Sequence, residues 1–369
     1  RSIVGSGVAE SKGIKRGVVV NLEAAVDSIK KAIEEAELMA GIEIDSVHLA
    51  LSGPHIKGFN SRGVIAVAGK NREITRDDVR RAIDAAKAVA LPTGREILHV
   101  LPQDFVVDEQ DGIGAPVGMT GARLEVNVHV VTGATSSTQN IVACVNRAGI
   151  AVVDTVIEQL AASDAVLTQD EKELGVALVD IGGGTSEVAV FSLGGMVAAR
   201  SIRIAGDEMD ENLVAYARRQ YNLLLGERTA EDIKIAIGSA YPGDWDAQRI
   251  TLRGRDLLTG LPRSVEVGAT QIREGLEPSI VEIINAVRDT IEETPPELLA
   301  DIMENGITLA GGGALLLGLD VRIAEETQMP VHIAEDPLTC VVRGTGIILQ
   351  DVDTLEKILV PETYQRPLR

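Results

Sequence analysis

The sequence predicts an α/β fold with more than one domain. The chain has 369 residues, more than the roughly 100–200 residues of a typical domain. Its 37 glycines stand mostly where runs of Val, Ile, Leu and Ala are interrupted, which is typical of many strand–turn–helix junctions. Apolar residues make up 45% of the chain and aromatic residues only 2%, so the predicted core is aliphatic.

The charge balance argues against nucleic acid as a partner. The formal net charge is −20, and a surface this acidic repels a phosphate backbone. Any nucleotide must then be held locally, by backbone amides and a few cationic side chains. Solubility is the simplest explanation of the charge itself.

The cysteines and the hydropathy indicate a cytosolic protein. Cys144 and Cys340 are far apart and stand among apolar residues, so buried thiols are expected rather than a disulfide framework or a zinc site. No apolar run reaches the ~18–20 residues that a membrane span needs, and we recognise no signal peptide.

Helix and strand patterns alternate along the whole chain. Residues 21–40 place apolar side chains on one helical face, with Asn21 as N-cap and Gly41 as C-terminal stop. Residues 174–206 have the pattern of three strands linked by glycine-rich turns. Further helices are predicted over 137–149, 207–221, 229–237 and 270–292.

Residues 54–133 have the pattern of an inserted unit. A strand leads to a helix that is opened by Thr75 and closed at Leu91, and two further strands follow. This strand–helix–strand–strand order predicts a small α+β domain.

The strongest functional signal is the segment DIGGGT. A buried strand ends at Asp180, and Gly182, Gly183 and Gly184 then turn into the next strand, followed by Thr185. Glycines let backbone amides converge on phosphate oxygens without Cβ clashes. The threonine adds a hydroxyl donor, and the aspartate can hold Mg²⁺ through water. No lysine follows, so this is not a Walker loop; the alternative is an ordinary hairpin turn.

A second glycine-rich segment lies near the end of the chain. Gly311, Gly312, Gly313 and Ala314 stand between a predicted strand and a predicted helix. Free amides at a helix N-terminus favour an anion or a ribose. A tight turn between strand and helix explains the same glycines.

A third segment combines acidic and basic side chains on one helix. Thr229 is its predicted N-cap. Glu231 and Lys234 then share a face at i, i+3 and could grip a ribose or an adenine edge. On its own such a pair is more typical of a surface ion pair.

These three segments, with a VVRGTG turn at 343–346, occur in the order found in the superfamily of actin, sugar kinases and heat-shock chaperones. The chain is therefore identified as a member of that superfamily. Residues 192–360 resemble the rod-shape protein MreB, on SIRIAGDEMDENL, YNLLLGERTAEDIKIAIGSAYP and PPELLADIMENGITLAGGGALL. Residues 1–191 resemble the division protein FtsA, on SKGIKRGVVVNLEAAV, ILHVLPQDFVVDEQDGI and PVGMTGARLEVNVHVVTG.

The resemblance implies an actin-like ATPase fold, in which two ribonuclease-H-like domains surround a nucleotide cleft and a small α+β domain of the FtsA type is inserted. The implied boundaries are 1–53 with 134–174 for the first large subdomain, 54–133 for the insert, 175–202 with 275–360 for the second large subdomain, 203–274 for an MreB-like small subdomain, and 361–369 for a tail.

The resemblance also implies ATP and Mg²⁺ as cofactors. It assigns Gly183, Gly184 and Thr185 to the phosphates. One wall of the ribose and adenine pocket would be Glu231, Asp232, Ile233 and Lys234, and the other Gly311, Gly312, Gly313 and Ala314.

The expected function is that of an ATP-binding cytoskeletal protein that polymerises in bacterial cell shape determination or division, with at most slow ATPase activity. A nucleotide-binding scaffold without turnover is the alternative, because the Asp-x-Gly-Thr loop with which both families open has no counterpart after Arg1. A sugar kinase of the same superfamily is a remote alternative.

The implied partners are further copies of the chain in a head-to-tail filament that involves the insert, and other division or elongation proteins at the membrane. The implied location is the cytoplasm, including the inner face of the cell membrane. The tail has too short an apolar face for the membrane helix with which FtsA ends.

Overall fold

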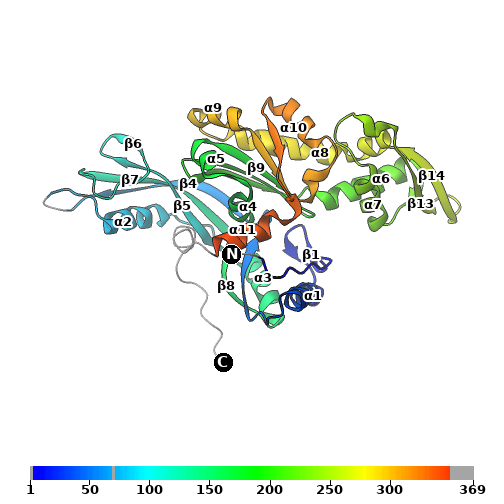
Figure 1. The fold of residues 1–369 in the computed structure, drawn as a ribbon, viewed down its shortest axis with the longest axis horizontal. Helices are drawn as coiled ribbons and strands as arrows, with labels where there is room; N and C mark the ends of the chain where they lie inside the picture. Colours follow the sequence, from blue (N-terminus) through cyan, green and yellow to red (C-terminus); the bar gives the residue numbers. More distant parts are fainter. Residues whose placement is uncertain (1–2, 69–70, 350–369) are drawn as a thin grey trace. The chain divides into compact units, whose positions relative to one another are not determined.

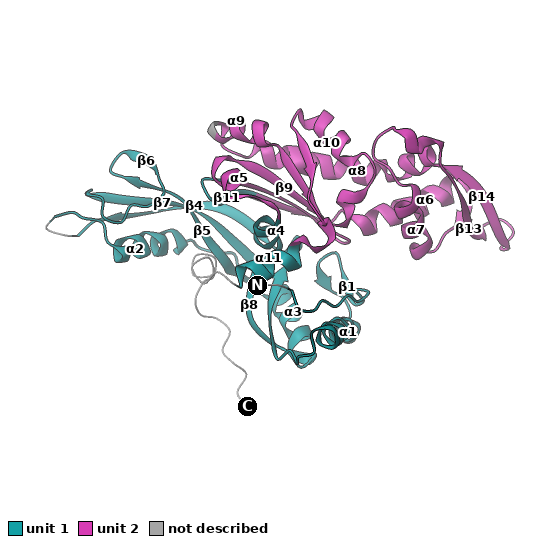
Figure 2. Ribbon diagram, in the orientation of Figure 1, with its two compact units in different colours: residues 1–165, 192–198, 341–369 teal, residues 166–191, 199–340 magenta. Residues whose placement is uncertain are grey.

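The computed structural model describes residues 3–68 and 71–349. The chain divides into two compact units (Figure 2), of which unit 1 comprises residues 1–165, 192–198 and 341–369, and unit 2 comprises residues 166–191 and 199–340. The predicted tail, 361–369, lies outside the described residues.

Unit 1 begins with a short hairpin and a long helix. The hairpin is β1 (Ile14–Lys15) and β2 (Val18–Val19), and the helix is α1 (Leu22–Ala40). Both predicted ends of α1 are confirmed: the Asn21 side chain accepts a hydrogen bond from the Ala24 amide at 3.1 Å, and Gly41 has a φ of +69°. The other elements of unit 1 outside the insert are β3 (Ser46–Leu51), α3 (Thr135–Arg147), β8 (Ala151–Ile157), parallel to β3, α4 (Glu158–Val166) and α11 (Cys340–Ile348).

The insert is an antiparallel sheet with one helix packed on one face (Figure 1). Its strand order is β4-β7-β5-β6. Alternate residues of β7 are fully buried against α2, as expected for a strand with one face on a core. The elements are β4 (Lys57–Ala66), α2 (Arg76–Lys87), β5 (Arg95–Val107), β6 (Gln110–Ile113) and β7 (Arg123–Ala134).

Helix α2 has the predicted start but not the predicted end. Thr75 caps it as predicted, with Asp78 completing a capping box. The helix ends at Lys87, however, before the predicted stop at Leu91.

Unit 2 is built on a mixed sheet of order β11-β10-β9-β15-β16, of which residues 192–198, at the end of β10 and the start of β11, are counted with unit 1. The three predicted strands of residues 174–206 are confirmed as β9, β10 and β11. Every residue of β9 and β10 is buried, in keeping with continuous apolar runs in strands covered on both faces. The strands are β9 (Val176–Ile181), β10 (Ser186–Ser192), β11 (Gly195–Ile202), β15 (Ile307–Ala310) and β16 (Val331–Ile333).

The rest of unit 2 is helical apart from a small sheet of order β12-β13-β14. The predicted helix 270–292 is confirmed as α8, and Pro296 then starts α9 at a position where no backbone N–H is needed. The elements are α5 (Gln169–Leu174), α6 (Gly206–Tyr221), β12 (Leu223–Leu224), α7 (Glu227–Ile237), β13 (Arg249–Asp256), β14 (Pro262–Gly268), α8 (Ala269–Glu292), α9 (Pro296–Asn305) and α10 (Leu319–Thr327).

The predicted turn at 343–346 is wrong, because these residues lie inside α11. A Cβ atom on Gly344 would come within 1.6 Å of the carbonyl oxygen of Ala161. This glycine therefore permits close packing of α11 against α4 rather than a change of chain direction.

Cys144 and Cys340 are both buried and neither forms a disulfide, so the prediction of buried thiols is confirmed. Within the described residues, no helix has both the length and the apolar content that crossing a bilayer requires.

Candidate functional site

The centre of the candidate site is the loop between β9 and β10. The two strands pair antiparallel, with Ile181 opposite Ser186. The amide of Gly182 donates to the carbonyl of Thr185 at 3.0 Å and so closes the loop. This loop is the predicted glycine-rich turn, and it stands at the end of a strand buried on both faces.

The first turn of α6 forms hydrogen bonds with the loop. The amides of Gly206 and Asp207 donate to the carbonyls of Gly182 and Gly183, at 3.1 and 2.7 Å. These bonds satisfy two of the amides that a helix leaves unpaired at its N-terminus. They also fix the orientation of the two peptide planes in the loop.

The outer side of the loop is open. Gly183 is exposed, and a Cβ atom on it would meet only Asp207 Oδ1, at 3.6 Å, among the described atoms. We find no hydrogen bond from the amides of Gly183 and Gly184 within the described part of the chain. Such amides are suited to bind an anion. The φ angles of these glycines are not in the left-handed region. Their contribution here is therefore the absence of a side chain beside the loop amides.

Asp180 and Thr185 lie at the two ends of the loop. Their side chains are buried, at 3% and 7% exposure. A Cβ atom on Gly311 would come within 2.4 Å of Asp180 Oδ1, so the carboxylate lies directly against the second glycine-rich segment.

The second glycine-rich segment lies beside the first because β15 runs parallel to β9, with Ala310 opposite Asp180. The carboxyl ends of parallel strands meet at one edge of a sheet, and the loops that follow them share that edge. The structure therefore brings the two segments together within unit 2.

The local structure of this second segment differs from the prediction. Gly311 has a φ of +77° and leads into a 3₁₀ turn, Gly312–Leu315, rather than an α-helix. Helix α10 begins only at Leu319. A Cβ atom on Gly313 would come within 2.2 Å of Ile181 Cγ2. The glycines therefore serve close packing over β9, and Ala314 is fully buried.

The third segment lies on α7, but its cap is not the predicted one. The helix starts at Glu227 with Gly226 as N-cap, so Thr229 is inside it. Glu231 and Asp232 are exposed. The side chain of Ile233 is only 2% exposed, so it belongs to the core.

Lys234 binds α6 rather than Glu231. Its Nζ donates to the carbonyl of Gly206 at 2.9 Å and to Asp210 Oδ2 at 2.8 Å. The same Gly206 donates its amide to the glycine loop. A continuous chain of contacts therefore runs from α7 through the start of α6 to the loop between β9 and β10.

Asp210 has an unusual electrostatic environment. Burial raises its pKa to about 6, the charges of Glu231 and Asp207 add to this rise, and the hydrogen bond from Lys234 opposes it. The sequence prediction missed Asp210 together with Gly206 and Asp207. A glycine and acids that open a helix directly after the third strand would have been the signal.

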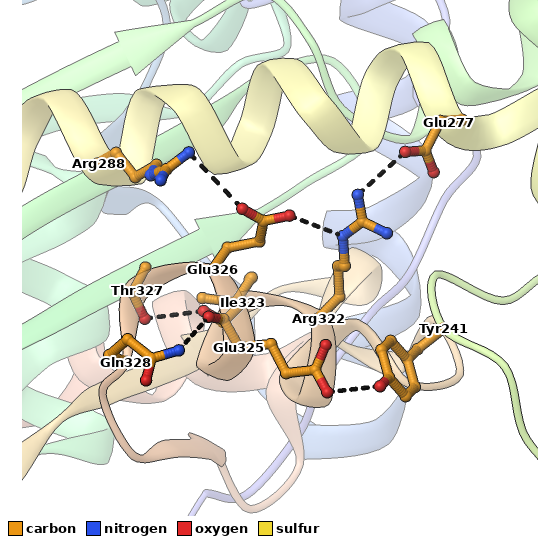
Figure 3. A network of polar contacts seen from close by, with 9 residues as sticks. All are labelled: Tyr241, Glu277, Arg288, Arg322, Ile323, Glu325, Glu326, Thr327 and Gln328. Atoms are coloured by element: carbon orange, nitrogen blue, oxygen red, sulfur yellow. Dashed lines mark hydrogen bonds and ion pairs between the residues drawn. The ribbon is translucent and has the colours of Figure 1, made fainter.

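A polar network holds α10, and with it the end of the second glycine-rich segment, against α8 (Figure 3). Arg322 binds Glu277 of α8 at 3.1 Å and Glu326 at 3.4 Å. Arg288 of α8 reaches Glu326 at 3.6 Å. The Tyr241 hydroxyl, from the segment after α7, donates to Glu325.

The third and second segments also meet by backbone contact. The amide of Ala240, just beyond α7, donates to the carbonyl of Leu317 at 2.7 Å. Contacts within unit 2 therefore connect all three predicted segments.

Two family models match this chain. One, described as "MreB/Mbl protein", matches residues 118–357, and the other, described as "SHS2 domain inserted in FTSA", matches residues 53–132.

Relatives come from both cell division and cell shape proteins. Cell division protein FtsA of Pseudomonas aeruginosa is 40% identical over 360 residues, covering 94% of this chain and 82% of its own length. Cell shape-determining protein Mbl of Bacillus subtilis is 36% identical over 322 residues, covering 80% and 94%. The similarity to FtsA thus extends well beyond residue 191, and the two resemblances overlap along the chain.

Solved structures show the same likeness. MreB5 of Spiroplasma citri bound to ADP is 25% identical, with a TM-score of 0.64, covering 94% of this chain and 80% of that one. A chain of the PilM-PilN type IV pilus biogenesis complex, at 15% identity and a TM-score of 0.62, covers 92% and 88% and shares the fold alone.

Proposed function

Because this chain belongs to the family of FtsA and MreB/Mbl proteins and has their actin-like ATPase fold with the FtsA-type insert, we propose that it is a nucleotide-binding cytoskeletal protein of bacteria that assembles with copies of itself. Its relatives are named for cell division and for cell shape. Its role lies in one of these two processes, at the inner face of the cell membrane.

The observation that carries the proposal is the loop between β9 and β10. Its carbonyls are fixed by the first turn of α6, while the amides of Gly183 and Gly184 make no hydrogen bond within the described residues. This arrangement supports binding of the phosphates of a nucleotide by Gly183, Gly184 and Thr185. A related protein, MreB5 of Spiroplasma citri, has been solved with ADP and with AMPPNP.

The nucleoside would lie toward α7 and the 3₁₀ turn. Glu231, Asp232 and Gly312 are exposed in these segments, and Lys234 is half-buried. The buried side chains of Ile233 and Ala314 would support the pocket rather than touch the ligand.

Mg²⁺ would accompany ATP. No group of three or more His, Cys, Asp or Glu side chains among the described residues is arranged to hold a metal. Mg²⁺ binds through one or two carboxylates, water and the phosphates themselves. The buried carboxylate of Asp180 fits an indirect role of this kind, in which water lies between the carboxylate and the ion.

The test is a nucleotide titration of the purified chain and of its Gly183→Val variant. We expect the valine to weaken ATP and ADP binding at least about tenfold, because its methyl groups would occupy the space beside the loop amides. Binding that is as tight in the variant as in the parent would refute the assignment of the loop.

Gly114→Val is the matched control. A Cβ atom on Gly114 meets no described atom within 4 Å, and this glycine lies in the insert. We expect its nucleotide affinity and thermal midpoint to equal those of the parent. The thermal midpoint of Gly183→Val should also be close to that of the parent, since a Cβ atom at this position meets only Asp207 Oδ1, at 3.6 Å, among the described atoms.

A further inference from the structure

One exposed face of unit 2 is basic although the chain is strongly acidic. Along β13, alternate residues point away from the core, among them Arg253 and Arg255, while Leu252 before them and Asp256 after them are buried. Neither guanidinium forms an ion pair within the described residues. The facing strand β14 carries one acid, Glu266, opposite Thr251.

The turn between β13 and β14, a few residues beyond these arginines, carries exposed apolar side chains. Leu258 and Leu261 are 79% and 65% exposed. The surface formed by Arg253, Arg255, Leu258 and Leu261 is called here the basic hairpin. Exposed large aliphatic side chains beside cations are typical of an interaction surface.

Unit 1 carries a surface of opposite character at the end of α1. A shallow hollow there is lined by Glu34, Glu37, Leu38, Gly41, Ile42 and Glu43. The side chains of Leu38 and Ile42 are 86% and 58% exposed. This set of six residues is called here the acidic hollow.

The two surfaces match in charge and in apolar content. Glu37 accepts a hydrogen bond from the Ile44 amide at 2.6 Å. Glu34 and Glu43 are exposed and form no ion pair within the described residues, so they are available to the arginines. The leucines of the basic hairpin would cover the exposed Leu38 and Ile42, while the arginines meet the acidic rim.

We propose that the basic hairpin of one copy docks on the acidic hollow of a second copy. The proposal rests on the self-assembly proposed above and names the surfaces that carry it. The contact is heterologous, because the two surfaces differ, so each copy keeps one of each available for a further copy. An anionic bilayer would attract the hairpin but repel the hollow, whereas a second copy accounts for both surfaces.

Charge reversal with rescue tests the pairing. Arg253→Glu/Arg255→Glu and, separately, Glu34→Arg/Glu43→Arg should each raise the protein concentration needed for pelleting with nucleotide about tenfold or more, since like charges would face each other. An equimolar mixture of the two variants should pellet better than either alone, and a chain with all four changes should regain the parental concentration. The four side chains are exposed and have no intramolecular ion pair within the described residues.

Arg147→Glu/Arg218→Glu is the matched control for net charge. Both arginines are exposed at helix ends elsewhere on the chain. We expect its pelleting to change less than threefold. Failure of the four-residue variant to recover would overturn the proposal. So would normal pelleting of Arg253→Glu/Arg255→Glu with loss of binding to vesicles of anionic phospholipid, which would assign the hairpin to lipid headgroups.

Failure of the parent to pellet would refute self-assembly itself. Crosslinking tests the contact independently of pelleting. The native Cys144 and Cys340 are fully buried, so a short bis-maleimide should react at introduced cysteines. Leu38→Cys mixed with Leu258→Cys should yield a covalent dimer, and neither variant alone should do so. Ile235→Cys, at a residue 74% exposed, is the control partner. No dimer from the first mixture, or equal dimer with the control, would overturn the inference.

Discussion

At the residue scale, the site depends on single groups whose neighbours determine their chemistry. Lys234 donates to both Gly206 and Asp210, so one cation holds the start of α6 and neutralises a buried acid. The position of the glycine loop follows from this, because Gly206 also donates its amide to Gly182.

Asp210 leads to a prediction for the pH dependence of stability. Its pKa is raised to about 6, chiefly by burial, so between about pH 4 and 6 the folded chain binds a proton that the unfolded chain has released. Stability from this group is therefore lost as the pH rises through that window. In urea denaturation without nucleotide, the parent should lose up to about 3 kcal/mol relative to Asp210→Asn between pH 4 and 6.

The comparison with Asp210→Asn removes the carboxyls that do not interact with this group, and Glu231 and Asp207, whose charges act on Asp210, are the neighbours whose titration changes with it. Parallel pH curves for the two proteins would mean that Lys234 offsets the cost of burial completely. The raised pKa would then be wrong.

At the element scale, helix positions depend on close backbone approach. Gly344 of α11 lies over the carbonyl of Ala161 in α4, and both belong to unit 1. Two residues later in the same helix, a Cβ atom on Gly346 meets no described atom within 4 Å. The two glycines therefore have different roles although both stand in one short motif.

Their alanine variants should move stability in opposite directions. Gly344→Ala forces α11 away from α4 and should destabilise the chain by about 1–3 kcal/mol. Gly346→Ala should be neutral or stabilising by up to about 1 kcal/mol, because alanine favours helix. Denaturant midpoints measure both effects. Equal loss of stability in the two variants would contradict the packing of α11 on α4.

At the scale of the whole molecule, the net charge of −20 opposes association of copies. Salt shortens the Debye length from about 30 Å at 0.01 M to about 8 Å at 0.15 M and so screens this repulsion. The protein concentration needed for pelleting with nucleotide should therefore fall over that range of ionic strength. Sedimentation at constant nucleotide measures it, and a steady rise with salt would show that local ion pairs outweigh the net charge.

Local signals were sufficient for much of the fold and for the main site. Asn21 and Gly41 bound α1, and Thr75 starts α2, because caps act through hydrogen bonds between neighbours in sequence. The apolar strand before the glycines and the glycines themselves predicted the loop between β9 and β10, since a buried strand and a tight turn leave a pattern in adjacent residues.

The wrong predictions concern residues whose local structure or partner is determined by residues far away in the sequence. Thr229 resembles a cap but lies inside α7, and Lys234 resembles a partner of Glu231 but binds Gly206 and Asp210 of another helix. Residues 343–346 resemble a turn but pack as a helix on Ala161. In each case the local alternatives are close in free energy, and tertiary contacts select between them.

The sequence by itself determined the family, the α/β class, the glycine loop and the chemical character of its residues, because these depend on residue type and short spacing. Only the tertiary structure decided that the segment at Gly311 lies against Asp180, that the α6 amides hold the loop and that Lys234 joins α7 to α6. These are contacts between residues far apart in sequence. They form only when parallel pairing of β9 with β15 and burial of both strands bring the segments to one edge of the sheet.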